Sequence, residues 1–258
     1  MHLIIDTHLH FYPCYDLSKA LNALRINLLR LDSNAVYIGI LAERSDCHFF
    51  KEMYENSSRF LTAGLKVIPL KGAILLKEDG FGDIYLLPGR QIVTSERIEM
   101  LCLLRDIKID DGLLAQEVIN IIRMNKGVPV LSWSPGKWFF KRGKIVRKLI
   151  LSNPPGSMLL GDTTSRPVCW PKPNIMKNAE KKGFVIISGS DPLPFSGDEN
   201  MMGRYATLIK CDFDTKDPDE SLRSFLLQPG IKPSLVGKRN NIFSLLYRMF
   251  KHSQLKTD

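Results

Sequence analysis

The chain has 258 residues, which suits one α/β domain and is short for two independent ones. Apolar residues make up 44% and charged residues 24%, as in an ordinary globular protein that buries a core. No apolar stretch approaches the roughly 20 residues needed to cross a bilayer, so we expect no membrane-spanning helix. The formal net charge of +9 favours anionic partners through long-range attraction.

Further classes are excluded by the N-terminus and the cysteines. The opening residues, MHLIIDTHLH, lack the basic start and small-residue cleavage site of a signal peptide, so we expect a cytoplasmic protein. The five cysteines are far apart and form no C-x-x-C pair, which predicts reduced thiols and no structural zinc cluster. Without a recognised nucleic-acid-binding motif, we expect a small, anionic substrate and no nucleic acid. Nothing indicates an oligomeric state.

Apolar runs and helical spacing predict the elements of the first half of the chain. Strands are expected at residues 2–12 and 35–42, and helices at Asp16–Leu31, with Asp16 as the cap, and at 46–56. Short strands are expected at 60–67 and 73–77, a strand or hairpin at 83–93, and a helix from Thr94 or Ser95 through Leu104.

The second half alternates more regularly between strands and helices. The expected strands are 128–133, 157–160 and 184–188, and the expected helices are 111–125, 142–151, 174–182, 198–209 and 243–250. Such alternation favours a parallel sheet with helical crossovers. Seven or eight strands indicate one TIM-barrel-like (β/α)7–8 α/β domain over residues 1–258, closed or distorted, with a doubly wound sheet as the alternative. Residues 212–258 are expected to form a peripheral, helical C-terminal extension.

The strongest chemical signal is the segment Asp6-Thr7-His8-Leu9-His10. Alternate residues of a strand face the same side, so we expect Asp6, His8 and His10 to point together. Two imidazoles one step apart at the carboxyl end of a strand can bind one cation. In a barrel, that end also carries the chemistry.

The residues IIDTHLHFYP resemble the first-strand signature of the amidohydrolase superfamily and of the related polymerase-and-histidinol-phosphatase (PHP) domain. The resemblance implies a metal-dependent hydrolase on a barrel fold, with His8 and His10 as metal ligands. Gly189-Ser190-Asp191-Pro192 resembles the last-strand motif of the amidohydrolases. That likeness implies that Asp191 binds metal and takes a proton from the attacking water.

The chain also departs from the amidohydrolase pattern. In that pattern, later strands add further metal-binding histidines. The other histidines of this chain are His2, His48 and His252, and none of them follows a middle or late strand. Ser132-Trp133-Ser134 and Gly161-Asp162 stand where further histidines would be expected. The predicted site is therefore sparse, with His8, His10 and Asp191 joined by Asp162 or Glu43. Three protein ligands and a water suffice for catalytic zinc.

Basic residues follow two of the predicted strands. Lys137, Lys141 and Arg142 follow one, and Arg166 follows another. We expect Lys137, Arg142 and Arg166 to hold an anionic substrate group, and Glu43 to line the same site. The alternatives are a solvated basic loop, an Arg166–Asp162 pair and a pairing of Glu43 with Arg44.

The sequence thus favours a metal-dependent hydrolase in which a metal-activated water attacks a carbonyl or phosphoryl centre. Zinc is the expected ion, and the ligand types also allow manganese or iron. Amide and phosphoester substrates both remain open. The alternative is a catalytically inactive barrel that binds an anionic small molecule or a protein partner, which the missing histidines favour.

Overall fold

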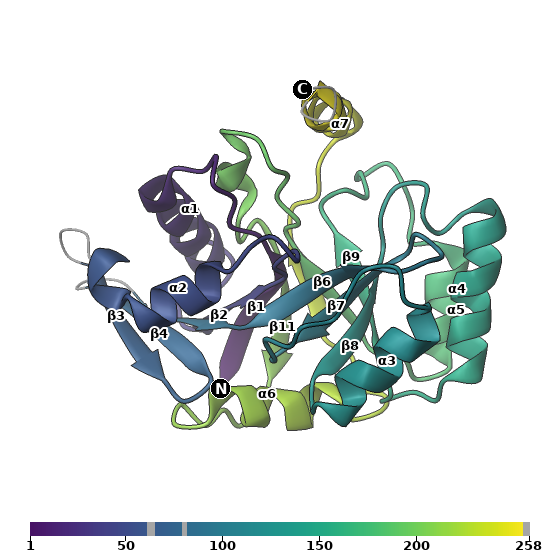
Figure 1. Cartoon of the computed structure of the whole chain (residues 1–258), viewed down its shortest axis with the longest axis horizontal. Helices are drawn as coiled ribbons and strands as arrows, with labels where there is room; N and C mark the ends of the chain where they lie inside the picture. The colour runs from purple at the N-terminus through teal and green to yellow at the C-terminus, as the bar shows by residue number, and fades with distance from the viewer. Residues whose placement is uncertain (61–64, 79–81, 255–258) are drawn as a thin grey trace.

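The computed structural model describes residues 1–60, 65–78 and 82–254. The chain folds into two β-sheets of seven and five strands with helices on their outer faces (Figure 1). The sheets do not close into one barrel, so the TIM-barrel prediction is wrong. A (β/α)8 barrel needs parallel strands joined by helices, whereas several neighbouring strands here are antiparallel.

The larger sheet has the strand order β12-β11-β1-β2-β5-β4-β3. Its parallel centre consists of β1, β2 and β5, and both flanks are antiparallel. Its strands are β1 (His2–Leu9), β2 (Val36–Leu41), β3 (Leu65–Leu70), β4 (Ala73–Glu78), β5 (Ile84–Leu87), β11 (Tyr205–Lys210) and β12 (Ser234–Gly237).

The smaller sheet has the order β10-β9-β8-β7-β6. The strands β8, β9 and β10 are parallel, and β6 and β7 form an antiparallel hairpin at one edge. Its strands are β6 (Gly89–Val93), β7 (Glu99–Leu103), β8 (Val128–Ser132), β9 (Leu159–Thr163) and β10 (Ile186–Gly189).

Each sheet is covered by its own helices. The outer face of the larger sheet packs on α1 (Leu17–Leu29) and α2 (Phe49–Glu55), and that of the smaller sheet packs on α3 (Ala115–Met124), α4 (Phe140–Ser152) and α5 (Asn174–Lys181). The predicted cap of the first helix is confirmed, because the Asp16 carboxylate accepts the Lys19 N–H at 3.1 Å. A third apolar cluster lies between the sheets and includes Leu222 and Leu226.

Two segments predicted as helices contain strands instead, and with these antiparallel strands the chain cannot form a (β/α)8 barrel. The segment Thr94–Ile98 is a hairpin turn in which the Arg97 N–H bonds to the Thr94 carbonyl oxygen at 2.8 Å, with Arg97 at φ +58°. The expected helix at 198–209 is a short 3-10 helix, Asp198–Met201, followed by β11. Gly203, at φ +73°, turns the chain between them. Both strands then pair antiparallel with their neighbours.

The two sheets contact each other at two places. On one side, the Ser188 N–H of β10 donates to Thr207 Oγ1 of β11 at 2.7 Å. On the other, a backbone bridge joins Glu43, just after β2, to Arg90 of β6. The carboxyl ends of β1, β2 and β10 therefore meet at one rim of the molecule.

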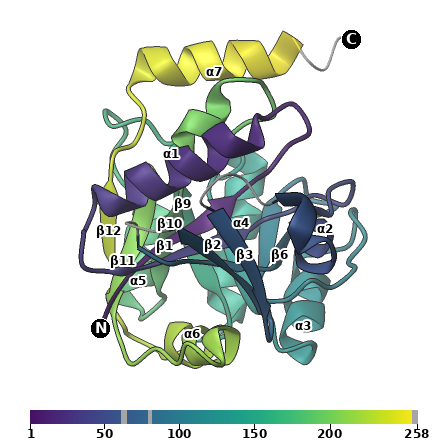
Figure 2. The ribbon, with the colours of Figure 1, turned by 90° about the vertical axis from the view of Figure 1, so that its left-hand side faces the viewer.

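The C-terminal segment contributes more than helices. It contains α6 (Pro218–Leu226), the sheet strand β12 and α7 (Ile242–Gln254). In both Figure 1 and Figure 2, α6 and α7 lie at opposite ends of the molecule, and α7 crosses the rim described above. Among the described residues, no helix has the length and apolarity needed to span a membrane.

Candidate metal centre

An irregularity in β1 aims its histidines at the space between the sheets. Ile4 packs in the cluster beneath α1, and so do Leu9 and Phe11, although strict alternation would put them on opposite faces. The change coincides with a shift of register between Asp6 and Leu9 in the pairing of β1 with β2. Such bulges re-aim side chains near functional sites. The expectation that Asp6 points with the histidines is therefore wrong.

Asp6 instead holds the backbone around the site. Its Oδ1 accepts the N–H groups of Ser190 at 2.8 Å and His8 at 3.2 Å, and its Oδ2 accepts the Gly203 N–H at 2.8 Å. Burial raises the pKa of Asp6, and these hydrogen bonds act in the opposite direction. The carboxylate thus links β1 to the turn that carries Asp191.

Asp191 follows β10 in a left-handed backbone conformation, with φ +50°. Its N–H donates to the His8 carbonyl oxygen at 2.9 Å. Gly189 makes this approach possible, because a Cβ there would lie 2.4 Å from the His8 backbone nitrogen. The local fold therefore brings two segments about 180 residues apart in sequence into direct contact.

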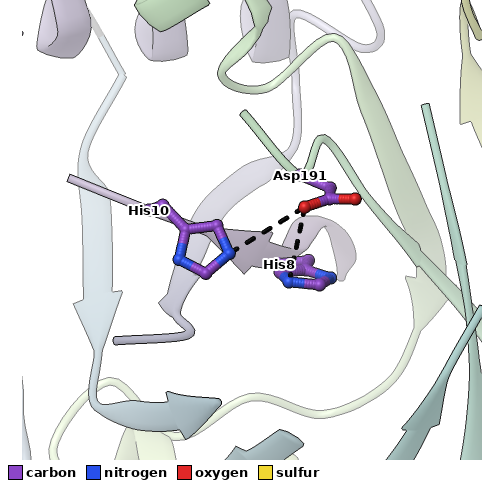
Figure 3. A group of neighbouring side chains, drawn as sticks. All are labelled: His8, His10 and Asp191. Carbon is purple, nitrogen blue, oxygen red and sulfur yellow. Dashed lines mark ion pairs between the residues drawn. The ribbon is translucent and has the colours of Figure 1, made fainter. Parts of the chain in front are cut away.

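Three side chains converge at this point (Figure 3). Asp191 Oδ1 lies 3.7 Å from His8 Nε2 and 3.9 Å from His10 Nε2. Each residue offers one possible ligand atom, and these three atoms lie within 4.8 Å of one another. Within the described ranges, no other three histidine, cysteine, aspartate or glutamate residues come together in this way. The two imidazole rings are 4.9 Å apart between centroids.

The donor set fits a divalent cation. Ligand atoms around tetrahedral zinc are about 3.3–3.6 Å apart for bonds of 2.0–2.2 Å, slightly closer than the distances found here. Burial and the neighbouring His8 hold the pKa of His10 well below its usual value, so His10 has the neutral ring that metal binding requires. Ser132 Oγ lies 3.4 Å from His8 Nδ1 and can orient that ring.

A cleft of about 690 Å³ opens beside the three residues. It is lined by His10 and Asp191 together with several cationic side chains, namely Arg44, Arg97, Lys137 and Arg142. Arg44 pairs with Asp46, and Lys137 with Glu99. Arg97 and Arg142 form no ion pair or side-chain hydrogen bond among the described residues. These two guanidinium groups are therefore available to an anion.

The other predicted site residues lie elsewhere. Asp162 and Arg166 form a buried two-pronged ion pair, with Nε–Oδ1 at 2.8 Å and Nη2–Oδ2 at 2.5 Å. Tyr205 Oη also donates to Asp162 Oδ2 at 2.9 Å. Glu43 is 2% exposed and accepts the Phe50 N–H at 2.9 Å. The structure therefore brings together His8, His10 and Asp191, with Lys137 and Arg142 along the cleft, and leaves Asp162, Arg166 and Glu43 outside its lining.

Sequence reasoning missed several residues of the site. Gln91 Oε1 lies 3.1 Å from His8 Nε2, and Glu99 and Arg97 line the cleft. All three belong to the β6–β7 hairpin or its turn. The prediction of a helix through residues 94–104 concealed Arg97 and Glu99, whereas Gln91 lies in the segment predicted as a strand or hairpin. Tyr12, which stacks on His10 at 5.3 Å between centroids, follows His8 and His10 at alternate positions, and that spacing was a usable signal.

Comparison with known proteins shows similarity in fold alone. No protein-family model and no curated protein matches the sequence. Among solved structures, PsfC from Pseudomonas syringae PB-5123 is 12% identical, with a TM-score of 0.62 over 98% of this chain and 99% of PsfC. The lesion-specific endonuclease PfuEndoQ from Pyrococcus furiosus is 11% identical, with a TM-score of 0.50 over 91% of this chain and 58% of the endonuclease.

Endonuclease Q has also been solved with a 27-mer duplex substrate that carries an abasic lesion at the active site. That structure is 10% identical to this chain, with a TM-score of 0.51 over 88% of this chain and 56% of the endonuclease. The chain thus spans just over half the length of these endonucleases. The expectation that nucleic acid is no partner is overturned, because proteins of this fold include an endonuclease with its duplex. The comparisons do not support an amidohydrolase.

Proposed function

We propose that this protein is a metal-dependent phosphoesterase whose ion is held by His8, His10 and Asp191. The observation that carries the proposal is the convergence of these three side chains beside a cleft that holds two arginines, Arg97 and Arg142, unpaired among the described residues. Two imidazoles and a carboxylate are a common ligand set for catalytic zinc, and manganese and iron accept the same donors. Zinc is the ion we expect.

A divalent ion at this place supplies a Lewis acid and lowers the pKa of water. The protein's own contribution begins with Asp191, whose Oδ1 faces both imidazoles and can accept a proton from the attacking water. Its Oδ2 accepts the Ser165 Oγ–H at 3.1 Å, which holds the carboxylate in this orientation. Neutral His10 offers the lone pair of its Nε2.

Two features favour a phosphoester over an amide as the substrate. Arg97 and Arg142 stand in the cleft without carboxylate partners among the described residues, and guanidinium groups match the planar, two-oxygen face of a phosphoryl group. The endonucleases of similar fold act on nucleic acid, whose backbone is a phosphodiester. The cleft would then bind the phosphoryl group through its arginines while Asp191 receives the proton.

The test compares turnover of phosphomonoesters, phosphodiesters, lactones and amides by the wild type and by Asp191→Asn. We expect phosphoester turnover that falls by about 10²-fold or more in the variant, the usual scale for loss of a general base. Asp111→Asn is the matched control, because Asp111 lines the same cleft but accepts the Val93 N–H instead. Equal turnover by wild type and Asp191→Asn would remove Asp191 from the mechanism. No turnover of any class would favour a non-catalytic, anion-binding protein.

A further inference from the structure

A second concave site lies on the other side of the loop that borders the cleft. It has a volume of about 550 Å³ and lies between the start of α4 and the segment leading into α5. Its aromatic lining consists of Trp138, Phe139, Phe140 and Trp170. Trp138 is buried and Phe139 is half-buried, whereas Phe140 is 93% exposed and Trp170 is 38% exposed. Two aromatic side chains therefore face solvent where core packing does not require them.

The backbone at Phe140 is unusual in a way that burial does not explain. Phe140 has φ +52°, a left-handed conformation that is rare and strained for a bulky residue. The ring gains almost no apolar contact in return, since it is exposed. Strain of this kind is kept mainly where a side chain is needed in a set position. Nearby, the rings of Phe139 and Trp170 pack with centroids 5.3 Å apart, which supports the exposed face of Trp170.

The charges around these rings have one sign. The charged residues lining the site are Lys144, Arg147, Lys172 and Lys177, and no aspartate or glutamate lines it. Lys172 is paired with Glu180 at 2.8 Å. The other three cations form no ion pair among the described residues. Exposed aromatic faces beside unpaired cations are the combination that binds stacked bases and their phosphates.

We infer that this aromatic and basic site binds single-stranded nucleic acid, with a base stacked on Phe140 or Trp170 and phosphates beside Lys144, Arg147 and Lys177. The loop between the two sites connects them. Lys137 and Arg142 line the catalytic cleft, while Trp138 to Phe140 and Gly143 line the second site. A strand held here can extend into the cleft. Binding itself needs no metal, so the inference stands or falls separately from the proposed function.

The experiment measures binding of a fluorescein-labelled oligothymidylate of about 12 nucleotides by anisotropy, without added metal. Phe140→Ala and Trp170→Ala should each weaken binding by about tenfold, the scale of one stacked base. Phe140 is the cleaner site, because removing an exposed ring disturbs no packing. Trp170→Phe keeps an aromatic ring and should recover most of the affinity. Phe243→Ala is the matched control, since that ring is 79% exposed on α7 and does not line the site.

Charge and strand length give two further readouts. Lys144→Glu with Arg147→Glu should lower the affinity and flatten its dependence on salt, measured between about 50 and 200 mM. Lys148→Glu, on the same helix but outside the lining, should have a smaller effect. Binding that is unchanged in both Phe140→Ala and Trp170→Ala would overturn the inference. A thymidine mononucleotide that binds as tightly as the oligonucleotide would overturn the assignment to a strand.

Discussion

Arg248 donates from Nη2 to the backbone oxygen of Asp191 at 2.9 Å, and so ties the C-terminal helix α7 directly to the candidate metal centre. The same guanidinium binds both carboxylate oxygens of Asp198, at 2.8 and 2.7 Å, and donates to Thr164 Oγ1 at 3.1 Å. Arg248 and Asp198 are both buried. One side chain therefore anchors α7 and supports the strained turn at Asp191.

Replacing Arg248 should be costly. Arg248→Ala leaves the buried Asp198 carboxylate without its partner, so we expect the free energy of unfolding to fall by about 3–5 kcal/mol in urea titrations. Arg223→Ala, which breaks the partly exposed pair with Glu220, is the control and should cost clearly less. Similar losses in the two variants would contradict the role given to the buried pair.

Gly189→Ala should distort the candidate metal centre by a steric clash, although it removes none of the three candidate ligands. The added methyl group would lie 2.4 Å from the backbone nitrogen and 2.5 Å from the Cβ of His8, so one strand must move. We expect a loss of roughly 1–3 kcal/mol in stability, as in other overpacked sites. Gly161→Ala, whose nearest neighbour is the Val130 Cγ1 atom at 3.2 Å, should be milder by denaturant unfolding. If Gly161→Ala proved the more harmful, the close approach of β10 to β1 would be in doubt.

Glu43 should make stability depend on pH. Burial raises the pKa of Glu43 to about 7 from an ordinary value of 4.5, and the nearby Arg90 offsets only part of the effect. The folded state therefore favours the protonated carboxyl group of Glu43. This preference stabilises the fold fully below about pH 4.5. That effect is lost as the pH rises towards about 7, and it amounts to about 3 kcal/mol.

The matched variant is Glu43→Gln, which can still accept the Phe50 N–H but cannot ionise. We expect the stability of the variant relative to wild type to increase between pH 5 and pH 8, measured by urea unfolding at each pH. A difference that stays constant across this range would show that Glu43 does not titrate there.

Local patterns predicted most of the individual elements. The leucine spacing and the Asp16 cap indicated α1, and the apolar runs indicated β1, β2 and β10. The main failures were the segments that became β7 and β11, where Thr94 and Asp198 resembled helix starts. Their antiparallel pairing depends on distant strands, which short-range periodicity does not report. Each of these strands stands where a helix was predicted and pairs antiparallel with its neighbour, so the predicted barrel does not form.

The grouping of the three candidate ligands could be predicted from the sequence, although the fold that holds them could not. His8, His10 and Asp191 were named from two short motifs, and the structure places them together. Asp162 was named because it follows a strand, yet its carboxylate is taken up by Arg166 and Tyr205. Strand ends alone cannot distinguish a ligand from an ion pair, since both need a buried carboxylate near a cation.

The most direct test of the account is the metal content of purified protein after equilibration with zinc or manganese and removal of free ion. We predict about one bound ion per chain in the wild type. The double variant His8→Ala, His10→Ala should lose most of its bound metal, while its circular dichroism spectrum shows that the fold is retained. His252→Ala is the control, because His252 lines the same cleft but does not belong to the group of three. Equal metal in the wild type and the double variant would contradict the metal centre proposed here.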